Sequence, residues 1–179
     1  MSNTATVLAF DFGASSGRAI RAVYDGQNLT YEEIHRFENV PIEKDGHLCW
    51  DVETLLKEIH TAIQKAGTFD SLGFDTWGVD FGLLDADGHL LANSVHYRDA
   101  RTNGKPEQAA ARMPAEELYA HTGNQIMAIN TLFQLLALRE QDPELLQKAA
   151  QILFMPDLFA ALLGAEPVCE RSIASTSQM

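Results

Sequence analysis

The sequence predicts a mixed α/β domain, and three observations lead to this fold class. Three segments near the N-terminus are rich in strand-forming residues and are separated by short turns. An amphipathic helical pattern follows them, and a further short apolar segment follows that helix. The rest of the chain consists mostly of short helical patterns between turn residues. This order places the strands of a mixed sheet first and most of the helices after it.

The three opening strands are expected at residues 7–10, 18–24 and 29–37. Val7 to Phe10 is nearly all apolar, which is typical of a strand buried on both faces. The Asp25-Gly26 pair is a signal for a tight hairpin. We therefore expect these three strands to be antiparallel.

The clearest helix is expected after Asp51, whose side chain suits an N-cap position. Six apolar residues then fall at helical spacing: Val52, Leu55, Leu56, Ile59, Ile63 and Ala66. Gly67 is expected to end this helix. Ser71 to Gly78 is expected to form the next strand, parallel to a strand of the first sheet, because a crossover helix leads to it.

The second half of the chain is expected to open with a hairpin of residues 81–84 and 89–95, and to continue as helices. The helix starts are indicated by proline and by capping residues: Pro114 at N1, Asn130, Asp142-Pro143 and Pro156. The expected order is three strands, a helix, a strand, a hairpin and then helices. This order is that of the opening of a mixed α/β domain of the ribonuclease H type.

Composition excludes some functions. The formal net charge of −12 argues against a broad basic surface for nucleic acid or for anionic membranes. No run of about 18 apolar residues indicates a membrane span. Cys49 and Cys169 are too few for a disulfide framework or a cysteine metal site, so we expect reduced thiols in a cytoplasmic protein. A small anion site remains compatible, since backbone N–H groups bind phosphate without net positive charge.

The first candidate site is the opening bend, residues 11–18, between the first two expected strands. Gly13 and Gly17 can adopt positive φ and let a ligand approach the backbone. Ser15 and Ser16 offer hydroxyl groups, and successive amides here can form an anion-binding nest. Asp11, at the end of the first strand, is placed to hold Mg²⁺ through water.

Arg18, at the end of this bend, can neutralise phosphate charge. The alternative is a decorated hairpin in which Asp11 only caps the turn. Other phosphate-binding classes do not fit: the chain has no G-x-x-x-x-G-K-[ST] motif, and its Asp-Phe-Gly triplet has no H-R-D loop before it.

The second candidate site lies in residues 73–85, where Asp75 and Asp80 flank Trp77-Gly78 at the expected end of a strand. Open α/β sheets place their ligand crevices at such ends. An indole ring beside a glycine can stack on a sugar, but a core tryptophan with two solvated carboxylates is an equally ordinary arrangement. A glycosidase would need the two carboxylates to face one bond, which their spacing does not show.

The third candidate, residues 96–104, concentrates His96, two arginines and an aspartate before a helix. It can be a polar wall of a substrate pocket or the solvated start of a helix, and spacing does not decide between them. The other histidines show no metal-ligand spacing and are expected to be structural or on the surface: His35, His47, His60, His89 and His121.

Taken together, the strings AFDFGASSGR, EIHRFEN, WDVETL, GFDTWGVDFGLLD, YRDARTNG and FMPDLFAALLG resemble the FGGY family of sugar kinases, in order and over nearly the whole chain. The resemblance implies an N-terminal, sugar-side domain of the ribonuclease H-like actin and sugar-kinase type, with a mixed sheet flanked by helices. It also implies transfer of the γ-phosphate of ATP to the 1-hydroxyl of L-rhamnulose, with Mg²⁺.

The resemblance assigns roles by position. The first phosphate-binding motif of the family matches Ala14, Ser15, Ser16, Gly17 and Arg18. Asp11 matches the acidic residue linked to Mg²⁺. Gly78 falls at a substrate-contacting position, and Trp77 is its expected neighbour in the sugar pocket.

The resemblance also implies what residues 1–179 do not contain. Members of the family are longer, and their catalytic aspartate, second phosphate motif and adenosine site are expected beyond residue 179. We therefore expect an N-terminal fragment with an incomplete first domain, inactive alone and completed by the missing C-terminal part of the same kinase. The alternatives are a kinase for another ketose or polyol, and a non-catalytic sugar- or phosphate-binding module.

Overall fold

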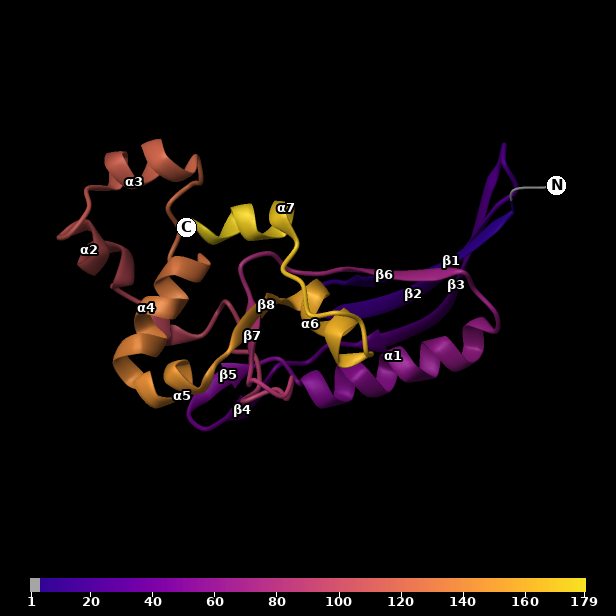
Figure 1. Ribbon diagram of the computed structural model, residues 1–179, viewed down its shortest axis with the longest axis horizontal. Coiled ribbons are helices and arrows are strands. Elements are labelled where there is room, and N and C mark those ends of the chain that lie inside the picture. The colour runs from indigo at the N-terminus through magenta and orange to yellow at the C-terminus, as the bar shows by residue number, and fades with distance from the viewer. Residues whose placement is uncertain (1–3) are drawn as a thin grey trace.

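A four-stranded mixed sheet forms the centre of the computed structural model, which describes residues 4–179 (Figure 1). Its strand order is β3-β2-β1-β6, with β1 (Ala5–Phe12), β2 (Ser16–Tyr24), β3 (Leu29–Glu38) and β6 (Ser71–Asp75). The pairs β1–β2 and β2–β3 are antiparallel, and β1–β6 is parallel. The mixed α/β fold class and the parallel placement of the strand after the helix are confirmed, although β6 ends at Asp75 rather than at Gly78.

Helix α1 (Val52–Ala66) crosses from the antiparallel strands to β6. The predicted cap is present, because the Asp51 carboxylate accepts hydrogen bonds from Thr54 N at 3.1 Å and Thr54 Oγ1 at 2.7 Å. Gly67 ends the helix with a φ of 67°, a conformation that favours glycine. The apolar face of α1 therefore begins and ends where the sequence predicts.

The core lies on one face of the sheet. Leu8, Phe10 and Phe12 of β1 are almost fully buried and share one cluster with α1 and α6 (Met155–Leu162). On the other face Ala9 is exposed, so the prediction of a strand buried on both faces is wrong for β1. The strand alternates as any half-buried strand does, and Ala9 concealed the alternation because alanine is apolar in sequence yet tolerates exposure.

Two small two-stranded sheets extend the fold. Strands β4 (Ile42–Lys44) and β5 (His47–Cys49) are joined by Asp45 and Gly46, which both have positive φ as a type I′ turn requires. Strand β7 (Phe81–Leu84) pairs with β8 (Gln151–Phe154).

The hairpin predicted from residues 81–84 and 89–95 is confirmed only next to its turn and is wrong beyond Leu91. Leu90 forms an isolated bridge to Leu84, and Leu91 N donates to Leu83 O at 2.9 Å. Further along, Ser94 O accepts from Trp50 N at 2.9 Å, and Leu48 O accepts from His96 N at 2.9 Å. Residues 94–96 lie beside β5 and supply hydrogen-bond partners for its backbone groups. Strand β7 pairs instead with the mostly apolar strand β8, which is far from it in sequence.

The remaining helices gather mostly at one end of the molecule, away from the β2–β3 hairpin tip (Figure 1). They are η1 (Ala100–Thr102), α2 (Lys105–Ala110), α3 (Ala115–Thr122), α4 (Thr131–Gln141) and α5 (Pro143–Lys148), with α7 (Arg171–Ala174) and η2 (Ser175–Ser177) near the C-terminus. Pro114 occupies the N-cap of α3, one position before the predicted N1. Among residues 4–179 no helix has the length and apolar character to cross a membrane.

Candidate functional site

The first two candidate sites meet at one edge of the sheet. The parallel pairing of β1 and β6 makes Asp11 and Asp75 neighbours, and both strands end within a residue of this pair. The opening bend therefore leaves this edge beside the turn that carries Trp77 and Gly78. The rings of Phe12 and Trp77 are 6.2 Å apart between centroids. This is the edge at which open α/β sheets place ligands.

Asn39 holds two carbonyl groups of the opening bend by hydrogen bonds. Its backbone N donates to Ser15 O at 3.0 Å, and its side-chain Nδ2 donates to Gly13 O at 2.9 Å. The amide of Gly13 donates to Ser16 O at 2.9 Å. The amides of Ala14 and Ser15 have no protein acceptor within residues 4–179. Two backbone donors are thus left free in a fixed bend, as an anion-binding nest requires.

The conformational role expected of the two bend glycines is wrong, because neither has positive φ. Gly17 is buried, and a Cβ built on it would lie 2.2 Å from Cζ of Phe37. Gly17 is therefore needed for close packing beneath the bend. Gly13 is exposed, and a Cβ there would lie 3.1 Å from Ser16 O.

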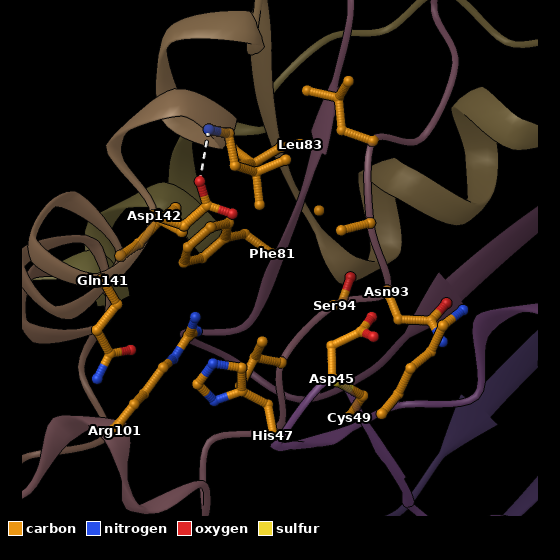
Figure 2. Close-up of a pocket in the computed structure, with 17 residues that line it drawn as sticks. Asp45, His47, Cys49, Phe81, Leu83, Asn93, Ser94, Arg101, Gln141 and Asp142 are labelled. Carbon is orange, nitrogen blue, oxygen red and sulfur yellow. Dashed lines mark hydrogen bonds between the residues drawn. The ribbon is translucent and has the colours of Figure 1, made fainter.

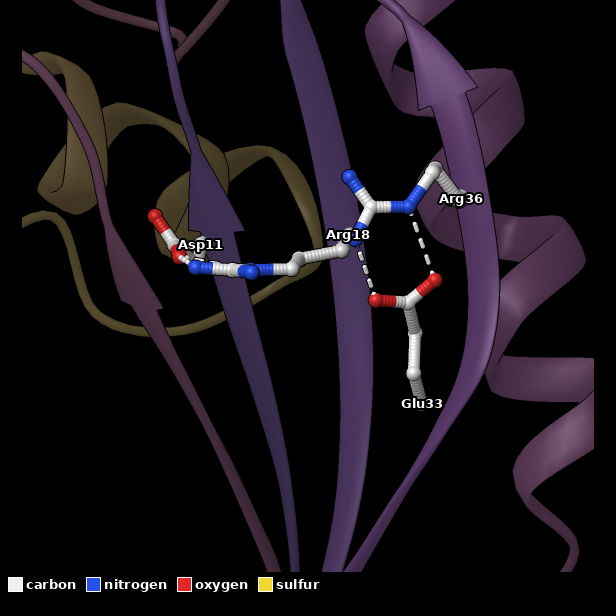
Figure 3. Close-up of polar contacts among 4 residues, drawn as sticks. All are labelled: Asp11, Arg18, Glu33 and Arg36. Atoms are coloured by element: carbon white, nitrogen blue, oxygen red, sulfur yellow. Dashed lines mark hydrogen bonds and ion pairs between the residues drawn. The ribbon is translucent and has the colours of Figure 1, made fainter.

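Asp11 is paired with Arg18 across the β1–β2 ladder (Figure 3). Arg18 Nε and Nη2 both donate to Asp11 Oδ2, at 2.8 and 2.5 Å. Arg18 also faces Arg36 on β3, and Arg36 is neutralised by its own ion pair with Glu33. Each arginine of this exposed face thus has a carboxylate partner.

The alternative interpretation, in which Asp11 only caps the turn, is wrong, because Oδ2 of Asp11 accepts from the guanidinium of Arg18 and not from the turn. Its Oδ1 accepts no hydrogen bond from the described part of the chain. Asp75, exposed and adjacent in register, supplies a second carboxylate that sequence reasoning did not pair with Asp11. Carboxylate oxygens and water are the ligands that Mg²⁺ prefers, so these two residues fit a hydrated magnesium ion.

Trp77 is half-buried, and one face of its indole stacks on Trp50 at 3.6 Å between centroids and 9° between planes. That face is therefore not available to a sugar. The Trp77 Nε1 atom is buried and has no hydrogen-bond partner within residues 4–179. Gly78, also half-buried, lies against the C-terminal segment, because a Cβ on it would be 3.5 Å from Thr176 Oγ1.

Asp75 and Asp80 have opposite environments. Asp75 is exposed, whereas Asp80 is fully buried and accepts hydrogen bonds from Trp50 Nε1, Tyr97 N and Gln134 Nε2. Burial raises the pKa of Asp80 to about 6, although these donors oppose the rise. The alternative with two solvated carboxylates is wrong for Asp80. A buried residue also cannot form a glycosidase pair with Asp75 on one glycosidic bond.

Residues 96–104 form neither a polar pocket wall nor a solvated helix start as a whole. His96 is buried against Trp50, with centroids 3.9 Å apart, and burial lowers its pKa to about 4, so the ring is neutral. Asp99 accepts from Leu48 N at 2.8 Å and therefore ties this segment to β5. A cavity of about 580 Å³ opens between β5, β7, α4 and α5 (Figure 2). Of residues 96–104, only Arg101 lines it.

This cavity does not include the opening bend or the Trp77-Gly78 turn. Apolar side chains of β7 line it together with polar residues that include Arg101, Ser94, His47 and Asp142 (Figure 2). Cys49 also lines it, and burial raises the pKa of its thiol, consistent with an unreactive cysteine.

One histidine departs from its expected isolation. His89 lies with Asp85 and Asp87 in the exposed turn after β7, and one ligand atom from each falls within 4.8 Å of the others. The Asp85 carboxylate already accepts from the backbone N of Asp87 and of His89, at 2.9 and 2.8 Å. The cluster is explained by the geometry of the turn.

Comparison with known proteins supports the sequence resemblance. Residues 6–179 match the family model described as FGGY family of carbohydrate kinases, N-terminal domain. The chain belongs to the FGGY family of carbohydrate kinases. It is 44% identical over 176 residues to a rhamnulokinase of Halalkalibacterium halodurans. That match covers 96% of this chain and 38% of that protein, so the chain spans well under half of its relative.

Solved structures of sugar kinases share the fold of this FGGY chain. A gluconate kinase from Lactobacillus acidophilus matches with a TM-score of 0.80 and 16% identity, over 98% of this chain and 36% of that chain. A ligand-bound xylulose kinase from the same organism matches with a TM-score of 0.78 and 18% identity, over 97% of this chain and 36% of that chain. The sugar-kinase fold class is thus confirmed.

Proposed function

We propose that the full-length protein containing this chain transfers the γ-phosphate of ATP to O1 of L-rhamnulose. One observation carries the proposal: a bend with two free amides and a carboxylate pair lies beside a Trp-Gly turn at the carboxyl edge of β1 and β6. Identity to a rhamnulokinase supports the choice of sugar.

The opening bend would hold the phosphates. The free N–H groups of Ala14 and Ser15 fit phosphate oxygens, and the exposed Ser15 and half-buried Ser16 add hydroxyl donors. Gly17 lets the bend pack closely on Phe37 and so fixes its position. Arg18 would neutralise phosphate charge when it releases Asp11.

Asp11 and Asp75 would hold Mg²⁺, which neutralises phosphate charge when it is bound. In the reaction the bond between the γ-phosphorus and its bridging oxygen breaks, and a bond from sugar O1 to phosphorus forms. The hydroxyl proton passes to a base. We propose that this base, an aspartate, and the adenosine site come from the remainder of the full-length protein, in a second ATP-binding domain.

The sugar would lie against Gly78 and the edge of Trp77 that is not covered by Trp50. Thr176 occupies the side on which a Cβ would lie, so sugar hydroxyls would approach the backbone groups of Gly78 from the sides that Thr176 leaves uncovered. A second candidate substrate class, other ketoses and polyols, is supported by the fold shared with a xylulose kinase.

A coupled assay of ADP production by the full-length protein with MgATP and a sugar panel tests the proposal. We expect kcat/KM for L-rhamnulose to exceed that for xylulose, gluconate and glycerol by at least about tenfold. We expect no turnover from the 179-residue chain alone. A different preferred sugar would support the second candidate, and sugar binding without any turnover by the full-length protein would indicate a non-catalytic binding module.

A further inference from the structure

We propose that Asp80 is a positioning residue that holds Trp77 and Gly78 in the geometry needed to bind the sugar. This inference rests on the proposed function, because it assigns to Asp80 an effect on the proposed sugar-binding residues. Asp80 itself is completely buried and does not reach the site.

One carboxylate joins three separate segments to the turn between β6 and β7. Asp80 Oδ2 accepts from Trp50 Nε1 at 2.7 Å and from Tyr97 N at 3.1 Å, and Oδ1 accepts from Gln134 Nε2 at 2.8 Å. Trp50 precedes α1, Tyr97 precedes η1, and Gln134 belongs to α4. Each segment is therefore fixed relative to the same two oxygen atoms.

The contact with Trp50 determines how Trp77 lies. Trp50 stacks closely on Trp77, at 3.6 Å, and on His96, at 3.9 Å. Stacking leaves a ring free to slide and rotate in its own plane, but a hydrogen bond at Nε1 removes that freedom. Asp80 therefore fixes Trp50, and Trp50 in turn supports the indole face of Trp77.

The contact with Gln134 acts on Gly78 through Val79. Val79 has a φ of 67°, an unfavourable conformation for a β-branched residue. Its carbonyl accepts from Thr131 Oγ1 at 2.7 Å and from Gln134 Nε2 at 3.4 Å. The same Gln134 nitrogen donates to Asp80 and to Ile129 O, and Arg101 donates to Gln134 Oε1, so Asp80 is one of three groups that hold this side chain beside the strained turn that presents Gly78.

A carboxylate is an expensive way to fill a buried space, and an apolar group of similar volume would stabilise the fold at least as well. The particular contribution of Asp80 is directional, because one side chain provides acceptors for three donors from different directions. Asparagine at this position keeps the size of the side chain but replaces one acceptor by a donor. In Asp80→Asn the amide oxygen can satisfy Trp50 and Tyr97, and the new NH₂ group then faces the NH₂ group of Gln134.

The test compares Asp80→Asn with Trp50→Phe in the full-length protein. Trp50→Phe keeps an aromatic ring but removes the N–H group. Asp87→Asn, an exposed site, is the matched control for loss of one negative charge. We expect each of the first two variants to raise the KM for L-rhamnulose about tenfold, with kcat and the KM for ATP changed less than about twofold. The double variant is expected to raise this KM more than either single variant, because Asp80→Asn disrupts the contact with Gln134 and Trp50→Phe removes the contact with Trp50.

An activity-independent readout separates this inference from the proposed function. In the ligand-free protein, the indole N–H NMR signal of Trp77 is expected to shift in Asp80→Asn and to stay unchanged in Asp87→Asn. If the protein phosphorylates a different sugar, this shift still tests the positioning role. An unchanged Trp77 signal and an unchanged KM in both Asp80→Asn and Trp50→Phe would overturn the inference while leaving the kinase proposal intact.

Discussion

Gly17→Ala is expected to destabilise the chain strongly, because the space for a methyl group is already filled. The added Cβ would lie 2.2 and 2.3 Å from Cζ and Cε2 of Phe37, whereas carbon atoms in contact normally lie about 3.5 Å or more apart. The ring would have to move by more than about 1 Å. The Phe37 ring packs edge-on against Phe12, with 5.4 Å between ring centroids, and lies 5.7 Å from the His35 ring centroid. These neighbours limit how far the ring can move. We expect a loss of about 3 kcal/mol, the upper part of the range for overpacked cores.

Urea unfolding of the 179-residue chain measures this loss, and Phe37→Leu supplies the decisive comparison. Leucine lacks the two clashing ring atoms, so Gly17→Ala made in the Phe37→Leu background should cost less than about 1 kcal/mol. Gly73→Ala in β6 is the control, because a Cβ there meets nothing within 4 Å and should be neutral or slightly stabilising. An equal cost of Gly17→Ala in both backgrounds would refute the packing explanation.

Three further predictions concern stability and the opening bend. The pKa of Asp80 is raised from 3.8 to about 6, so folding favours its protonated form. The wild-type chain should therefore lose about 2 kcal/mol of stability relative to Asp80→Asn as pH rises from about 4 to about 6.5, measured by urea unfolding across that range. A difference that does not change with pH would contradict this assignment. Asn39→Asp removes the donor to Gly13 O and should lower the free energy of unfolding by about 1–3 kcal/mol. It should also raise the KM for ATP of the full-length protein, and an unchanged KM would show that Asn39 does not support phosphate binding by the bend. Asp51→Ala removes the cap of α1 and should cost about 1 kcal/mol by thermal unfolding, whereas a cost near zero would show that the cap contributes nothing.

Local patterns were sufficient for the elements that carry the opening bend. The apolar spacing and the caps of α1, and the turn residues between β2 and β3, are read within a few residues of each other. The parallel placement of β6 followed from the crossover rule alone. These elements bring the bend and the Trp-Gly turn to one edge of the sheet, so the location of the candidate site could be predicted.

Features that depend on distant partners could not be predicted. Strand β7 pairs along its length with β8 and meets residues 89–95 only at Leu90 and Leu91, and no local pattern predicts this arrangement. The burial of Asp80 could not be predicted, because its three donors, from Trp50, Tyr97 and Gln134, are far from it in sequence. The need for Gly17 is likewise set by Phe37 on another strand.

The most direct test of the phosphate-binding role is a crystal structure of the full-length protein with MgADP and with a non-hydrolysable MgATP analogue. We expect phosphate oxygens about 3 Å from the backbone N of Ala14 or Ser15, with the metal linked to Asp11 directly or through water. A nucleotide whose phosphates bind elsewhere, while these amides face solvent and Asp11 stays paired with Arg18, would contradict the proposed role of the opening bend.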